Sequence, residues 1–150
     1  MKHLLIALLS LGLAAGASAA GQYGSNHSTS AMVGAYGPGI GGIFSYSIPL
    51  NVDGLARSGL GIVAEGQLGG GIGDDKFGMA TMVGAKLVFV LNRTTDIYGG
   101  LGVGSELLPD TNIGAGGQVG LNLNLDGTRV FFEAGAHPGS NNYLGVGLRF

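Results

Sequence analysis

The sequence contains no cysteine and no tryptophan, and only 11% of its 150 residues are charged. The absence of cysteine excludes a disulfide framework and a lipid anchor attached through a cysteine. With 45% hydrophobic residues, the chain is also unlike a disordered segment, which is typically rich in charge and poor in hydrophobic residues. Seven Lys and Arg against nine Asp and Glu leave no basic patch, so the composition argues against binding to nucleic acid.

The chain also lacks an apolar run long enough for a membrane-spanning helix. Its main apolar segment, residues 4–16, is shorter than the about 20 residues that such a helix needs. A short basic start precedes this segment, and Ala17-Ser18-Ala19 follows it, which is the pattern of a secretory signal peptide cleaved near Ala19 or Ala20. We therefore expect a signal peptide over residues 1–20, a flexible lead-in over 21–29 and one folded domain over 30–150.

Glycine is abundant, with 32 residues, and apolar residues alternate with glycine or polar ones along most of the chain. In residues 112–126 every large apolar side chain falls on an odd position, and such a period of two is typical of a β-strand with two different faces. Asp126-Gly127 predicts a two-residue hairpin turn between two strong segments. Applied throughout, the period predicts eight strands, at residues 30–37, 41–50, 58–68, 77–90, 95–105, 112–125, 128–137 and 141–150.

The distribution of charge decides which face of these strands is inside. A soluble calyx, the alternative, would carry charges on the face opposite the apolar one, but that second face is mostly Gly, Gln, Asn and Ser. The apolar face carries no charge, as contact with hydrocarbon requires. The sequence therefore predicts an all-β fold, an eight-stranded antiparallel up-and-down transmembrane β-barrel, closed because an open sheet edge is excluded in lipid.

The end of the chain carries a resemblance to a known family. Leu144, Val146, Leu148 and Phe150 alternate up to a terminal aromatic residue. Together with the signal peptide and the eight amphipathic segments, this pattern resembles the small eight-stranded outer-membrane β-barrel proteins, including the opacity-type barrels. The resemblance implies location in the cell outer membrane, contact with outer-membrane lipid, and insertion by the barrel-assembly machinery, which reads the terminal strand as its signal.

Several polar side chains fall on the predicted inner face. We expect a network in the lumen made by Glu65, Lys86, Gln118, Asn122, Glu133 and Arg149, with Tyr98 beside it. Buried charges persist only when they are paired or solvated, so two acids and two bases suggest an ion-paired plug, and the family resemblance implies the same. Many glycines share this face, and they either admit water or let opposite walls approach. A conducting path therefore stays open as the alternative.

Two motifs suggest chemistry, and both have a simpler interpretation. Residues 70–78 match one copy of a calcium-binding nonapeptide that works by stacking many copies, so a hairpin loop with two exposed acids is favoured. His137 and Ser140 resemble the rim residues of outer-membrane lipid A deacylases, but their spacing differs and no acid follows His137 to orient it. A plain turn is favoured there.

These observations predict a structural integral outer-membrane protein, either an envelope component or an accessory subunit of a larger outer-membrane complex. We expect no enzymatic activity, no catalytic residue, no cofactor and no metal. The alternatives are a minor channel for water or small solutes and a rim enzyme acting on lipid through His137 and Ser140.

Overall fold

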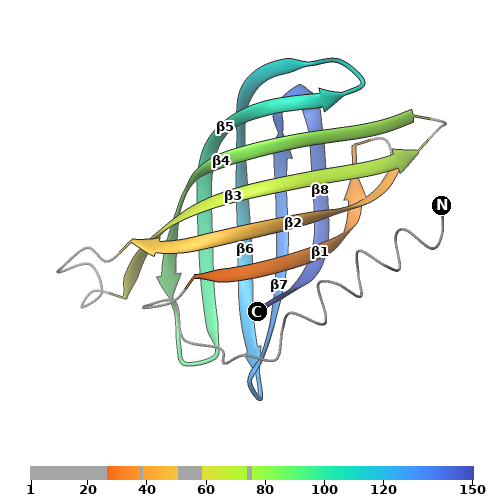
Figure 1. Cartoon of the computed structure of the whole chain (residues 1–150). Coiled ribbons are helices and arrows are strands. Elements are labelled where there is room, and N and C mark those ends of the chain that lie inside the picture. The colour runs from red at the N-terminus through yellow and green to blue at the C-terminus, as the bar shows by residue number, and fades with distance from the viewer. Residues whose placement is uncertain (1–26, 38, 51–58, 74–75) are drawn as a thin grey trace.

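The computed structural model describes residues 27–37, 39–50, 59–73 and 76–150, and the predicted signal peptide lies outside them. Eight antiparallel strands form a closed barrel in which each strand pairs with its neighbours in sequence and the last pairs with the first (Figure 1). The predicted eight-stranded barrel is therefore confirmed. The strands are β1 (Ser28–Tyr36), β2 (Gly39–Leu50), β3 (Leu60–Gly73), β4 (Lys76–Val90), β5 (Thr95–Leu108), β6 (Asn112–Leu125), β7 (Thr128–His137) and β8 (Asn141–Arg149).

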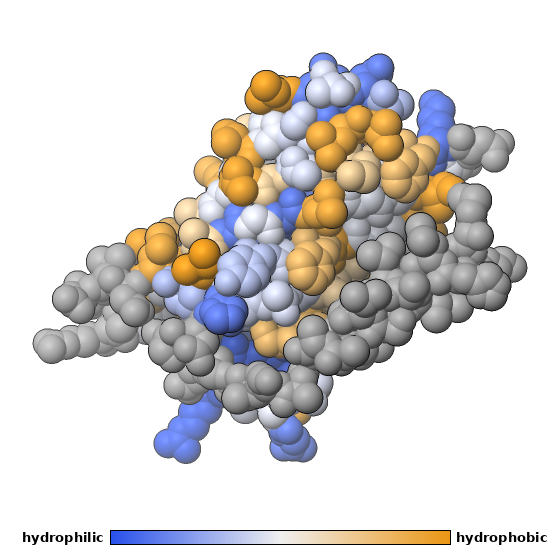
Figure 2. Space-filling model, viewed as in Figure 1, coloured by the Kyte–Doolittle hydropathy of each residue, from blue (hydrophilic) through white to orange (hydrophobic). Residues whose placement is uncertain are grey.

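The two alternating sets of residues in each strand form the two surfaces of the barrel, the apolar set outside and the small or polar set inside. Large apolar side chains on the outer surface are strongly exposed, among them Leu101 at 79% and Ile113 at 90%. In Figure 2, apolar side chains are distributed over the visible outer face of the strands among paler residues and a few hydrophilic ones, and further hydrophilic residues lie at the top and bottom of the view. No helix among the described residues is long and apolar enough to cross a membrane.

The strand ends differ from the prediction in several places: β2 begins two residues earlier, at Gly39, β5 ends three residues later, at Leu108, and the end of β3 differs most. Strand β1 begins at Ser28, so the lead-in ends two residues earlier than expected. Strand β3 continues to Gly73 and β4 begins at Lys76, so most of residues 70–78 form paired strand and not the expected loop. Gly69, Gly70 and Gly71 all pair in register with residues of β4, so this run of glycines continues the strand and does not form a turn. The two acids of this motif, Asp74 and Asp75, lie outside the described residues.

The predicted hairpin turn is present between β6 and β7. Asp126 and Gly127 both adopt positive φ angles, 50° and 87°, as the tight turn between right-twisted strands requires. The Asn124 side chain accepts a hydrogen bond from the Gly127 amide at 3.2 Å. This turn lies at the same end of the barrel as the start of β1 and the end of β8.

The inward glycines make room for the large side chains of neighbouring strands. An added Cβ at Gly120, Gly135 or Gly147 would collide with an aromatic ring or hydroxyl, and at Gly100 with the Lys86 side chain. The four pairs are directly opposite one another in register: Tyr98 with Gly120, Phe131 with Gly147, Tyr143 with Gly135 and Lys86 with Gly100. These four glycines are thus covered by the side chains of their register partners, which fill that part of the lumen.

Candidate functional site in the barrel interior

The centre of the lumen is the carboxylate of Glu65, which is 6% exposed. Lys86 on the adjacent strand β4 forms a short ion pair with Glu65 Oε2, and the hydroxyl of Ser47 on β2 donates to the same oxygen. From β8, Arg149 Nη1 lies 3.6 Å from that oxygen. Gln118 Nε2 on β6 donates to the other oxygen, Oε1, at 2.9 Å. The carboxylate therefore joins both cations of the lumen to strands on opposite sides of the barrel.

The second acid, Glu133 on β7, is held by hydroxyl and amide donors. Tyr98 Oη donates to Oε2 at 2.7 Å, and Tyr143 Oη donates to Oε1 at 3.0 Å. Gln67 Nε2 lies 3.2 Å from Glu133 Oε1 and 3.1 Å from Glu65 Oε1, so one amide bridges the two acids. Because Gln67 also donates to Gln118, the polar side chains form one connected network.

Both cations also lie over aromatic rings. Lys86 Nζ is 4.7 Å from the centroid of the Tyr98 ring, and Arg149 Cζ is 4.9 Å from that of Phe131. The exposed fractions of Lys86 and Arg149 are only 1% and 5%, so these contacts form away from solvent, where cation–π attraction is strongest. Two acids and two bases, each with partners, make the centre of the lumen electrically balanced.

All six residues predicted for the lumen lie inside the barrel, and five of them join the network around Glu65 and Glu133. The sixth, Asn122, donates through Nδ2 to Asp96 on β5, toward the end with the chain termini. Sequence reasoning missed Gln67, Tyr36 and Tyr143. The alternation of the sequence could have identified them. Gln67 is two residues from Glu65 and so lies on the same face of β3, and Tyr36 and Tyr143 fall on the inward positions of β1 and β8.

His137 belongs to this interior and not to the rim. It is 1% exposed, with Nε2 2.8 Å from Gln67 Oε1 and Nδ1 2.9 Å from Tyr36 Oη. Since the amide oxygen accepts, Nε2 carries the proton and Nδ1 accepts from the tyrosine hydroxyl, which fits a neutral imidazole. The histidine predicted to lie at the rim is the last residue of β7, and its in-phase position with Glu133 turns it inward. The Ser140 side chain is outside the described part.

The turn that follows His137 closes the end of the barrel opposite the termini. The 3₁₀ segment η2 (Pro138–Ser140) packs against β4, β5 and β6 across the opening. Asn141 Nδ2 donates to Pro138 O at 3.0 Å and to Glu106 Oε1 at 3.3 Å, and so ties the turn to β5. Gly139, with φ of 80°, lies against the Glu106 carboxylate in a position that no side chain could share.

Replacing His137 by Leu is expected to lower the free energy of unfolding by about 1 to 3 kcal/mol, because Tyr36 Oη and Gln67 Oε1 then lose a buried partner. Urea titration of the refolded protein in phospholipid vesicles measures this change. Leu101→Ala, on the outer face, is the control for general sensitivity to substitution. A His137→Leu variant as stable as the wild type would show that the imidazole bonds contribute nothing.

The residues predicted as an assembly signal lie on or just beyond β8. Leu144 and Val146 point outward, 63% and 42% exposed. Phe150 follows the strand, and its backbone exchanges hydrogen bonds of 2.7 and 3.1 Å with that of Thr29. Pairing of the last residue with β1 completes the barrel seam. Recognition of these residues by the assembly machinery stays a prediction.

No group of three or more His, Cys, Asp or Glu side chains that could hold a metal ion occurs among the residues that the structure describes. The interactions recorded in the interior are hydrogen bonds, ion pairs and cation–π contacts. Its chemistry is that of a cross-linked plug between the walls of the barrel.

Comparison with known proteins finds the fold but no sequence relative. No family model matches the chain, and no curated protein sequence does. Among solved structures, the outer-membrane enzyme PagL matches with a TM-score of 0.56 and 16% identity, over 82% of this chain and 98% of that one. Ail, the attachment invasion locus protein of Yersinia pestis, solved with the heparin analogue sucrose octasulfate, matches with a TM-score of 0.51 and 16% identity, over 83% and 98%.

These neighbours are barrels of the outer membrane, and the outward positions of the described strands, which carry no charge, suit the same location. Identity of 16% carries the fold and not the activity. The chain therefore has the fold of the small eight-stranded outer-membrane β-barrel proteins.

Proposed function

We propose that the chain is a structural integral protein of the outer membrane, either an envelope component or an accessory subunit of a larger outer-membrane complex. The observation that carries the proposal is a lumen crossed by side chains, combined with an outer wall that has no charge at the outward positions of the described strands. A barrel of this kind presents its lipid-facing wall as its main surface for interaction.

The apolar wall extends over nearly the full length of the strands. On β6 the outward residues run from Ile113, through Val119, to Leu125, without a charge among them. Twelve residue steps of about 3.4 Å, tilted by about 40°, span roughly 30 Å across the membrane, against an apolar band of about 25 Å in barrels of this type. The membrane therefore covers almost the whole barrel.

One set of connections between the strands is very short. At the end opposite the termini, the strands are joined by two or three residues each, at 37–38, 74–75, 109–111 and 138–140. Barrels that act as adhesins or receptors usually bind their partners through extended loops at this end. The short connections instead favour partners within the membrane. For insertion, we propose that the terminal strand is the signal that the assembly machinery recognises.

The two alternative functions meet specific obstacles. A channel would need a path through the lumen, where Glu65, Glu133 and the side chains bound to them connect opposite walls. A rim enzyme would need an accessible base, whereas the His137 imidazole is buried and both of its nitrogens have partners. The outer-membrane enzyme PagL shares the fold, and that likeness alone does not supply the missing geometry.

Photo-crosslinking in intact membranes tests the proposal. A crosslinking amino acid in place of Leu101, the outward residue of β5 that is 79% exposed, is expected to label membrane lipid or a membrane protein. The control position is Gln118, whose side chain is buried in the lumen and should label only the barrel itself. Labelling of soluble proteins from the Leu101 position would contradict the proposal, because that wall would then face water.

A further inference from the structure

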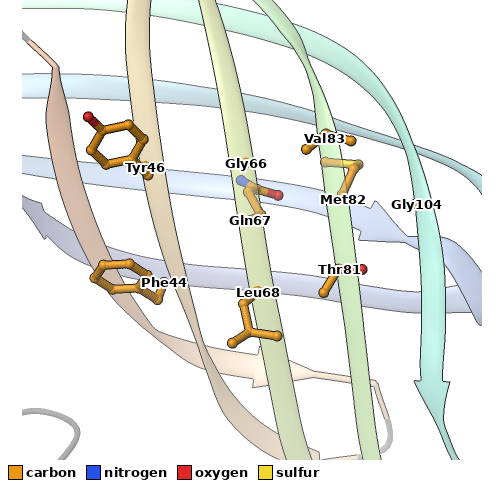
Figure 3. Close-up of a pocket in the computed structure, with 9 residues that line it drawn as sticks. All are labelled: Phe44, Tyr46, Gly66, Gln67, Leu68, Thr81, Met82, Val83 and Gly104. Atoms are coloured by element: carbon orange, nitrogen blue, oxygen red, sulfur yellow. The ribbon is translucent and has the colours of Figure 1, made fainter.

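The outer wall contains a hollow of about 380 Å³ that lies over β3 between β2 and β4 and reaches Gly104 on β5 (Figure 3). Phe44 and Tyr46 on β2 form one side and Val83 on β4 the other, with Leu68 at one end. The complete lining comprises Phe44, Tyr46, Gly66, Gln67, Leu68, Thr81, Met82, Val83 and Gly104.

The hollow exists because an outward position on β3 has no side chain. Gly66 is the register partner of Tyr46 on one neighbouring strand and of Val83 on the other. A Cβ added at Gly66 would have Val83 Cγ1 as its nearest neighbour, at an ordinary contact distance of 3.7 Å. The glycine therefore satisfies no close packing demand, unlike the inward glycines, and it leaves a gap between two large residues.

The lining is chemically suited to hydrocarbon. Gln67 and Met82 belong to the inner face and are buried there, so the floor of the hollow is backbone that is already paired in the ladder. The outward side chains carry no charge, and their polar atoms are the hydroxyls of Tyr46 and Thr81. Water in such a hollow would find few partners, whereas a hydrocarbon chain would gain contact with both sides.

The width of the hollow selects among membrane occupants. Strands β2 and β4 lie two strand spacings apart, about 10 Å between backbones, and the Tyr46 and Val83 side chains narrow this further. An α-helix, about 10 to 12 Å across with its side chains, cannot enter. The wall of a second barrel is convex and would bridge the gap. A single hydrocarbon chain fits between the two sides.

One end of the hollow also offers groups for a lipid headgroup. Tyr46 lies next to Thr29, close to the start of β1 and therefore toward the end with the termini. The His27 ring stacks on it with a centroid distance of 5.7 Å. Tyrosine is favoured at membrane interfaces, and both its hydroxyl and an imidazole N–H can donate to a phosphate oxygen.

We propose that the hollow beside Gly66 holds one acyl chain of a phospholipid from the leaflet on the side of the chain termini, with the headgroup near Tyr46 and His27. The inference deepens the proposed function, on which it rests, because it requires this wall to face lipid. It assigns the patch between β2 and β4 to a bound lipid, and so leaves other parts of the wall for protein partners.

Native mass spectrometry of the full chain, extracted from membranes in mild detergent, tests the inference. We expect the wild type to retain one phospholipid and Gly66→Leu, which fills the hollow, to retain at least about tenfold less, since losing contact with two methylenes already suffices for that factor. Gly99→Leu is the matched control. Gly99 is also an outward glycine with its nearest neighbour at 3.7 Å, but it lies outside the hollow. If Gly66→Leu fails to fold, Thr81→Leu fills the same space.

The outcomes separate the possibilities. Equal phospholipid retention by Gly66→Leu and the wild type would overturn the inference, as would a retained glycolipid in place of a phospholipid. A dimer that disappears only in Gly66→Leu would overturn it as well and would assign the hollow to a second copy. Photo-crosslinking from Leu101 reports on the proposed function independently, so a failed lipid assignment with intact membrane labelling would leave that function standing.

Discussion

Replacing Glu65 by Ala is expected to lower the free energy of unfolding by about 3 to 5 kcal/mol, the range observed when one partner of a buried ion pair is removed. The substitution leaves Lys86 and Arg149 in the lumen without their shared carboxylate. Both cations are almost completely buried, so water cannot replace the lost partner. Urea titration in phospholipid vesicles, followed by the boiled and unboiled mobility on a gel, measures the loss.

The double variant Glu65→Gln with Lys86→Met controls for the removal of charge itself. It removes an acid and a base together, and therefore should lose less stability than the two single variants summed. In the network around Glu133 the double variant leaves one acid, Glu133, and one base, Arg149. If Glu65→Ala unfolds within about 0.5 kcal/mol of the wild type, as an ordinary surface substitution does, the lumen network is not a structural element.

Replacing Gly120 by Val is expected to cost about 3 kcal/mol or more and to reduce the fraction of protein that folds. The new side chain would overlap the Tyr98 ring and approach the Phe132 carbonyl oxygen. Moving the ring would break its 2.7 Å hydrogen bond to Glu133. Overpacking of a well-packed interior costs about 1 to 3 kcal/mol by itself, and loss of the bond adds to it. The fraction that migrates as the compact unboiled species measures folding.

Gly99→Val is the control for this substitution. Gly99 lies next to Tyr98 on β5, but it faces outward, and its nearest neighbour is at 3.7 Å. Valine is also favoured in strands, so this variant should fold at least as well as the wild type. If the Gly120 and Gly99 variants fold to the same fraction, then the inward glycines are not required to make space for the aromatic rings of neighbouring strands.

The fold could be predicted from the sequence because, within each strand, apolar residues alternate with small or polar ones and so identify its two faces. The odd-position apolar residues of β6 specify one face without reference to any other strand. Strand ends were less accurate where glycine, which favours neither face, occupied the boundary, as at the end of β3. There the length of β3 depends on its pairing with β4, and the residues of β3 alone do not predict how far this pairing extends.

The partners within the lumen could be predicted only as a set. Glu65 and Arg149 come from strands on opposite sides of the seam, and their meeting depends on how far each strand is displaced along its neighbours. If one strand shifts by two residues along its neighbour, every side chain still points to the same face of the barrel, but each one lies opposite a different residue. His137 shows the same limit, because a residue next to a turn can point to the rim or inward, and its contacts with Tyr36 and Gln67 decide which.

Solute permeation tests the central claim, a barrel that is sealed inside and interacts through its wall. Purified protein is reconstituted into liposomes, and their swelling in small sugars is compared with that of empty liposomes and of liposomes with a known porin. The filled lumen predicts swelling no faster than in empty liposomes. Swelling that depends on solute size and on the amount of folded protein would contradict the account, because it would show that the lumen conducts.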